Sequence, residues 1–108
     1  MVQVNWSLEA QEDVFNIFQY WSQFTVEYAR NLMEEMFSLT DLLELTPSMG
    51  AIETSFKNPK HEYRFLVIQK SYKVVYMYEN NVCDILIVWD CRRNPQLLKT
   101  RIRKNNQL

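Results

Sequence analysis

The spacing of hydrophobic residues changes once along the chain, and this change constrains the fold more than any other feature. Between residues 8 and 46 hydrophobic side chains recur every three or four positions, as on one face of a helix. From His61 to Asp90 they recur at every second position, as on one face of a β-strand. Because the helical and strand patterns occupy separate parts of the chain, the sequence predicts an α+β fold.

The first half carries capping residues for two helices. Ser7 precedes an acidic first turn and Thr25 follows a break at residues 22–24, and either side chain can accept a hydrogen bond from a helix N-terminal N–H. Pro47 and Gly50 are expected to end the second helix. Because the break at residues 22–24 leaves so short a link between the two helices, we expect them to form an antiparallel helical hairpin. Its hydrophobic stripes comprise Val14, Ile17, Phe18, Trp21, Tyr28, Ala29, Leu32, Met33, Met36, Phe37 and Leu43.

The second half predicts three strands in an antiparallel meander. The alternating patterns cover residues 63–68, 74–78 and 85–89. Lys70-Ser71 and Asn80-Asn81 separate these runs, and asparagine tolerates the positive φ of tight hairpins. We therefore expect both pairs to form hairpin turns.

The predicted element order is β-α-α-β-β-β with a short C-terminal helix. Residues 2–6 are β-prone, and Pro95 can open the last helix, over residues 96–104, because proline is tolerated in a first turn. We expect the helical hairpin to cover one face of a mainly antiparallel sheet of about four strands. The first strand is expected at an edge or beside the last strand, and the other face is expected to stay partly open. Residues 1–108 are expected to form a single domain, since a second would lack a core of its own.

The two halves of the chain carry opposite charge. The whole chain has a formal net charge of −1, which by itself argues against a nucleic-acid-binding protein. Residues 1–54, however, hold nine acidic residues and one basic residue, a net charge of −8, and residues 55–108 hold eleven basic and four acidic residues, a net charge of +7. This predicts an acidic helical layer, a basic sheet-and-tail layer, and a charged partner.

Several classes of protein are excluded by composition. The longest hydrophobic run, residues 85–89, is far short of the ~20 residues that span a bilayer, and the N-terminus does not resemble a signal peptide, so no membrane partner is expected. If Cys83 and Cys91 flank one strand they lie about 26 Å apart, beyond disulfide reach, and a reduced cytoplasmic protein is expected. Two cysteines and one histidine provide no metal site, and one glycine provides no phosphate-binding loop. No metal and no cofactor are expected.

A series of short motifs resembles the RelE/ParE toxin superfamily of bacterial toxin–antitoxin modules. In chain order they are Val4-Asn5-Trp6-Ser7, Leu42-Leu43-Glu44-Leu45-Thr46-Pro47 with Gly50, Glu62-Tyr63-Arg64-Phe65-Leu66-Val67, Tyr72-Lys73-Val74-Val75-Tyr76, Ile85-Leu86-Ile87-Val88-Trp89-Asp90 and Asp90-Cys91-Arg92-Arg93-Asn94-Pro95. The last is similar to the Arg-x-x-Pro close of many ParE-like members. The resemblance covers nearly the whole chain and is closer to ParE-like members.

The resemblance implies the toxin of a type II toxin–antitoxin system of the plasmid-stabilisation kind. Such a toxin is neutralised by a cognate antitoxin that wraps it, and it contacts operator DNA only through that antitoxin. ParE-like members inhibit DNA gyrase, whereas RelE-like members cleave messenger RNA on the ribosome. The tail after Asp90 has neither the histidine nor the tyrosine that many ribosome-dependent members use. We therefore expect a non-enzymatic toxin that binds a protein target such as gyrase. The alternatives are a ribosome-dependent mRNA endonuclease and an inactive member of the family.

Basic residues are the candidates for contact with the target or with nucleic acid, since arginine binds carboxylates and phosphates through a bidentate fork. These candidates are Lys57, Lys60, Arg64, Arg92, Arg93, Lys99 and Arg101. Two structural alternatives remain open: residues 99–104 can form a solvated tail, and Arg64 can pair with Glu62 or Asp84 to brace the sheet.

The candidate catalytic residues, if the chain is a nuclease, are Arg64, Glu62, His61 and Arg92. His61 is the only histidine, and a solvated loop position is the simpler interpretation of it.

The candidate antitoxin-binding residues are the aromatics Trp21, Tyr28, Tyr76 and Trp89. Aromatic residues of an open sheet face could instead stack on bases, and the same residues could simply form the core.

Overall fold

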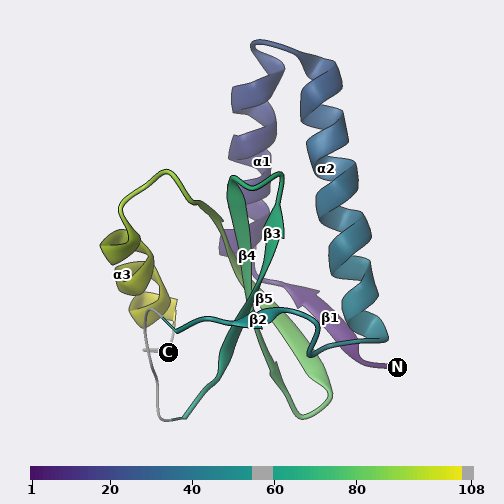
Figure 1. Cartoon of the computed structure of the whole chain (residues 1–108), viewed down its shortest axis with the longest axis vertical. Helices are drawn as coiled ribbons and strands as arrows, with labels where there is room; N and C mark the ends of the chain where they lie inside the picture. Colours follow the sequence, from purple (N-terminus) through teal and green to yellow (C-terminus); the bar gives the residue numbers. More distant parts are fainter. Residues whose placement is uncertain (55–59, 106–108) are drawn as a thin grey trace.

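The computed structural model describes residues 1–54 and 60–105, and it has an α+β architecture as expected. The N-terminal strand β1 (Gln3–Trp6) leads into α1 (Leu8–Ser22) and α2 (Val26–Asp41), which run antiparallel as a hairpin (Figure 1). A 3₁₀ turn η1 (Leu42–Glu44) and a two-residue strand β2 (Ala51–Ile52) follow. The chain continues through β3 (Tyr63–Ile68), β4 (Tyr72–Glu79), β5 (Val82–Asp90) and α3 (Pro95–Asn105).

The five strands form one sheet in the order β1-β5-β4-β3-β2. β1 runs parallel to β5, and the other neighbours are antiparallel. The expected count of about four strands was low because Ala51 and Ile52 are too few residues to produce a periodic pattern. The sequence left two placements open for β1, at an edge of the sheet or beside the last strand. In the structure both hold, because β1 is the edge strand and its neighbour is β5, the last strand of the chain.

The predicted caps and turns are largely confirmed. Ser7 Oγ accepts the Ala10 N–H at 3.0 Å, and Thr25 Oγ1 accepts the Tyr28 N–H at 3.3 Å. The Asn80-Asn81 turn has positive φ at both residues, 51° and 64°.

Two predicted boundaries are corrected. The first strand turn centres on Gln69 and Lys70, with φ of 52° and 57°, one residue earlier than expected. α2 ends at Asp41 rather than near Pro47, because the chain tightens into η1, which buries Leu43 and directs the Glu44 carbonyl to the Val2 N–H at 3.2 Å.

Hydrophobic side chains fill both faces of the sheet. The helical hairpin covers one face, where Leu32 and Met36 of α2 and Ile85 of β5 belong to one buried hydrophobic cluster. α3 covers part of the other face, where Leu98 and Ile102 pack with Trp89. The sequence led us to expect that this second face would stay partly open. Because α3 packs on it, it is covered in part. No helix in residues 1–54 and 60–105 is long and apolar enough to cross a membrane.

A buried tyrosine joins the sheet to the segment that follows α2. The Tyr76 hydroxyl donates to the Pro47 carbonyl at 2.7 Å and accepts the Gly50 N–H at 3.0 Å. From β3, Arg64 Nη1 donates to the carbonyls of Ser48 and Gly50, at 3.2 and 2.8 Å. These bonds satisfy the carbonyls of Pro47, Ser48 and Gly50 and the Gly50 N–H, directly before β2, which pairs with β3.

Replacing Gly50 with alanine should destabilise the fold. A Cβ at this position would lie 2.7 Å from the Tyr76 hydroxyl oxygen and 2.8 Å from the Phe65 carbonyl oxygen, which is closer than real contacts allow. We expect Gly50→Ala to lower the free energy of unfolding by about 1–3 kcal/mol in urea denaturation. Ser48→Ala is the control, because Ser48 contributes only its backbone carbonyl to these bonds. Equal stability of Gly50→Ala and the unmodified chain would contradict the tight packing described here.

Candidate functional site

The C-terminal half of β5 has an edge that no strand of residues 1–54 and 60–105 covers. β1 pairs only with residues Val82 to Ile85 of β5, so the edge of β5 beyond Ile85 faces α1 instead. Polar side chains of the helical layer cap two of its backbone groups: Ser7 Oγ donates to the Leu86 carbonyl at 2.8 Å, and an Asp13 carboxylate oxygen accepts the Val88 N–H at 3.0 Å. This edge forms one wall of a pocket.

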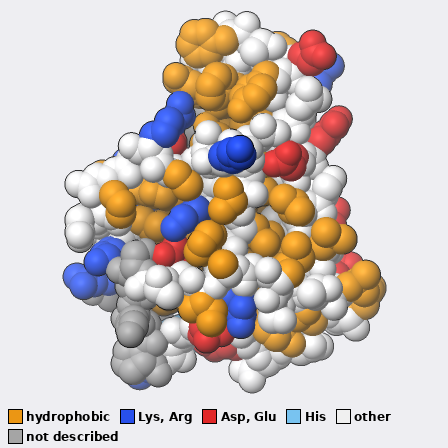
Figure 2. Space-filling model, viewed as in Figure 1, with side chains coloured by type: hydrophobic (Ala, Val, Ile, Leu, Met, Phe, Trp, Pro, Cys, Tyr) orange, Lys and Arg blue, Asp and Glu red, His pale blue; other side chains and the backbone are white. Residues whose placement is uncertain are grey.

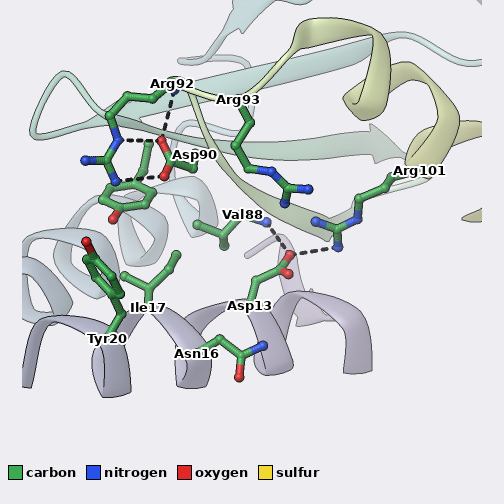
Figure 3. Close-up of a pocket in the computed structure, with 10 residues that line it drawn as sticks. Asp13, Asn16, Ile17, Tyr20, Val88, Asp90, Arg92, Arg93 and Arg101 are labelled. Carbon is green, nitrogen blue, oxygen red and sulfur yellow. Dashed lines mark hydrogen bonds and ion pairs between the residues drawn. The ribbon is translucent and has the colours of Figure 1, made fainter. Parts of the chain in front are cut away.

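The pocket lies between α1, the end of β5, the β5–α3 loop and α3, and its volume is about 410 Å³. Figure 3 shows three arginines on the side opposite α1, two of them from the loop and one from α3. The lining residues are Asp13, Asn16, Ile17, Tyr20, Tyr72, Val88, Asp90, Arg92, Arg93 and Arg101. Three of the seven basic residues singled out from the sequence therefore meet at one place.

Arg92 is held by Asp90 at the end of β5. Its Nε and Nη2 donate to the two carboxylate oxygens of Asp90 at 2.9 and 2.8 Å, and its backbone N–H donates to the same group at 2.9 Å. The bidentate contact lowers the pKa of Asp90 and raises the pKa of Arg92. The Arg92 side chain is more than half exposed, so the Asp90–Arg92 pair is in contact with solvent on the side of the arginine.

Arg101 connects the last helix to the first. Its guanidinium donates to Glu9 at 2.6 and 2.8 Å and to Asp13 at 3.0 Å. Burial raises the pKa of Asp13, although Arg101 and the Val88 N–H act in the opposite direction. The expected acidic and basic layers therefore neutralise one another in part where α1 meets α3.

Arg93 differs from the other two arginines. Its guanidinium carbon lies 4.8 Å from the centre of the Trp89 ring, and that of Arg101 lies 5.9 Å from the same ring. Trp89 is only 3% exposed, so it is a rigid platform for a cation–π contact. Among the described residues no carboxylate forms an ion pair with the Arg93 guanidinium.

The other basic candidates do not join this pocket. Arg64 donates to Glu62 Oε1 at 3.1 Å as well as to the carbonyls near Gly50, which is the bracing role left open by the sequence. His61 Nδ1 pairs with Glu79 Oε1 at 2.6 Å. Lys60 is exposed, Lys99 is half-buried on α3, and Lys57 lies outside the described residues.

The nuclease candidates therefore fall in two separate places. Across the sheet, Ile68 of β3 pairs with Tyr72 of β4, which pairs with Asp90 of β5. Arg64 lies four residues from Ile68 along β3, a distance of about 13 Å at the rise of a strand. Arg64, Glu62 and His61 thus stand near one end of the strands and Arg92 near the other. Among the described residues, no group of three or more His, Cys, Asp or Glu side chains could hold a metal ion.

The aromatic candidates are mostly internal. Tyr76 is fully buried and Trp89 nearly so, which corrects the expectation that their side chains offer a surface to an antitoxin: both are needed to fill the core. Trp21 and Tyr28 are half-buried, with ring centres 4.8 Å apart, and the Trp21 indole N–H donates to the Tyr72 hydroxyl at 2.8 Å.

An exposed aromatic tip lies next to these residues and was missed in the sequence. Tyr20 and Phe24, at the turn of the helical hairpin, are 49% and 67% exposed, and their ring centres lie 5.5 Å apart. Figure 2 shows hydrophobic atoms gathered over this end of the hairpin. Phe24 stands directly before the Thr25 cap, in the predicted break, and a large aromatic side chain in so short a connection was the available signal.

A family model described as the ParE toxin of the type II toxin–antitoxin system, parDE, matches residues 4–95. A search of curated proteins found no match.

Two solved structures were matched, and one of them shares the fold. A chain of the chromosomal ParDE toxin–antitoxin system from P. aeruginosa gives a TM-score of 0.67 at 16% identity, covering 83% of this chain and 96% of that chain. A chain of the YoeB-YefM complex from Staphylococcus aureus gives a TM-score of 0.49 at 16% identity, covering 82% and 94%.

These findings define the class as a small α+β domain with the fold seen in a toxin–antitoxin system. The chain belongs to the ParE toxin family of type II toxin–antitoxin systems, because the family model spans most of its length. The resemblance to ParE-like members that the sequence motifs indicated is thereby confirmed.

Loss of the Asp90 carboxylate should produce a pH-dependent loss of stability. Because the folded pKa of Asp90 lies below its ordinary value of 3.8, its contribution is present above pH 3.8 and disappears as the pH falls through the folded pKa. We expect Asp90→Asn to lower the free energy of unfolding by up to about 1 kcal/mol at pH 7, since the partner Arg92 is largely exposed. Urea denaturation should show this difference narrowing below pH 3.8.

Glu34→Gln, an exposed change on α2, is the control and should show no comparable difference. A difference between Asp90→Asn and the unmodified chain that stayed constant down to pH 2 would contradict the role given to the Asp90–Arg92 pair.

Proposed function

We propose that this toxin-family chain is neutralised by a small cognate antitoxin and acts by binding a protein target, DNA gyrase being the one expected from its family. The observation that carries this proposal is a continuous exposed surface that joins the aromatic tip to the arginine pocket. Tyr20 belongs to both, because it lines the pocket and contacts Phe24. Exposed aromatic residues beside arginines are characteristic of protein–protein interfaces.

The side chains that a nuclease would use are engaged elsewhere, which supports a binding role. Arg64 holds backbone carbonyls of the segment before β2, and His61 is paired with Glu79. Neither side chain lies among the pocket residues where Arg92 stands. A transition state for RNA cleavage needs its cationic and acid–base groups at one reacting phosphate. Both possible targets are cytoplasmic, so the proposal places the chain in the cytoplasm.

The antitoxin part of the proposal is tested by co-purification with the small protein encoded next to this chain. We expect the two to co-purify, and we expect Tyr20→Ser with Phe24→Ser to weaken binding more than about 10-fold in calorimetry, because exposed aromatic anchors dominate interface energetics. Leu45→Ser is the matched control, since Leu45 is equally apolar and even more exposed but follows η1, away from the turn of the hairpin. A toxin that binds no neighbouring small protein contradicts the proposal.

The target is tested by two assays on the purified chain. We expect saturating toxin to inhibit DNA supercoiling by gyrase and to leave messenger RNA intact in a translating extract. Codon-positioned cleavage with unchanged supercoiling would reject gyrase in favour of the endonuclease alternative. No effect in either assay, together with normal growth on expression without antitoxin, would identify an inactive member of the family.

A further inference from the structure

Arg93 is the one arginine of the pocket that forms no ion pair with a carboxylate among the described residues, and its charge is unmatched in this sense, although it contributes to the lowered pKa of Asp90. Arg92 is paired with Asp90, and Arg101 is shared between Glu9 and Asp13. Arg93 has the Trp89 ring as its side-chain contact, at 4.8 Å. The guanidinium lies over the ring in a cation–π contact, which uses none of its N–H donors and leaves them available to an incoming acceptor.

The direction of the Arg93 side chain is towards the pocket. Figure 3 shows it reaching down between the Asp90–Arg92 pair and Arg101, with Ile17 and Tyr20 of α1 on the facing side. Arg101 lies against the same Trp89 ring and is fixed by its two carboxylates. An anion that enters the pocket therefore meets the guanidinium of Arg93, which has no ion pair, and the guanidinium of Arg101, which its two carboxylates hold in place. Ile17 and Tyr20 form the apolar wall beside them.

We propose that Arg93 anchors one side-chain carboxylate of the antitoxin, and that the hydrophobic residue beside that acid packs on the aromatic tip formed by Tyr20 and Phe24. The proposal rests on the proposed function, since it names the chemistry by which that partner is held. Arginine suits this task because its fork binds a carboxylate through two parallel hydrogen bonds.

The charge of the pocket favours a single carboxylate over a nucleic-acid backbone. Asp13 and Asp90 also line the pocket, and each repels a second anionic group that approaches its edge. Nucleic-acid binding requires many cations along a chain of phosphates, whereas this pocket offers one unmatched cation. A volume of about 410 Å³ accommodates an acidic side chain together with part of its neighbour.

Calorimetry with the purified antitoxin tests the role of Arg93. We expect Arg93→Gln to weaken antitoxin binding at least 10-fold and Arg93→Glu to weaken it further, with Arg93→Lys intermediate because it keeps the charge but loses the fork. Arg103→Gln is the matched control: Arg103 is an exposed arginine of the adjacent helix α3 that does not line the pocket, and its loss should change affinity less than 2-fold. The Arg93 variants should fold, since Arg93 is exposed, and thermal unfolding followed by circular dichroism checks this.

Charge reversal identifies the partner group. Each Asp and Glu of the antitoxin is replaced in turn with Arg, and one replacement should restore at least 10-fold of the affinity lost by Arg93→Glu. If no replacement restores binding, the carboxylate contact is overturned even when Arg93→Gln binds weakly. A 20-nucleotide single-stranded RNA is the second probe, and an Arg93→Gln chain that loses RNA binding while keeping antitoxin affinity also overturns the proposal.

The failures of the two proposals are distinguishable. An unmodified chain that does not bind the antitoxin overturns the proposed function. An unmodified chain that binds it with the same affinity as Arg93→Glu overturns only the role given to Arg93.

Discussion

The contact of Arg101 with Glu9 and Asp13 is the interaction on which the arrangement of the site depends. It ties the last helix to the first across the edge of β5, and Asp13 in turn accepts the Val88 N–H of that edge. One acidic turn of α1 therefore positions both α3 and the end of β5. Removing one member of such a partly buried group leaves another charge uncompensated, which is why a contact of this kind holds geometry more than it adds net stability.

The short β1 strand has an equally large effect on the surface. Because β1 covers only the first part of β5, the second part is left to side chains of α1 rather than to another strand. The pocket lies beside this second part of β5, and the β5–α3 loop brings Arg92 and Arg93 to its rim. The position of the pocket therefore depends on where β1 pairs along β5 as much as on which residues line it.

Much of the fold could be predicted because its signals are local. A serine or threonine before a helix and an asparagine pair between strands act within a few residues, and Ser7, Thr25 and Asn80-Asn81 all behave as expected. The strand β2 could not be predicted, since Ala51 and Ile52 form a strand only through contacts made by Tyr76 and Arg64 with residues 47–50. Arg92, Arg93 and Arg101 were recognised as candidates, but the partners of Arg101 were not, because Glu9 and Asp13 lie about 90 residues away from it in the chain.

By itself the sequence determined the order of the elements, the side of each helix that is apolar, the resemblance to ParE-like toxins, and a separation of charge between the two halves. These properties depend on spacing and composition, which are present in any conformation of the chain. Only the tertiary structure decided that the separated charges meet, that Tyr76 and Trp89 are core residues, and that Tyr20 and Phe24 are exposed. Those outcomes depend on which surfaces pack together. Packing decides that Arg101 finds two carboxylates, whereas Arg93, which lies 4.8 Å from the centre of the same tryptophan ring, forms an ion pair with none among the described residues.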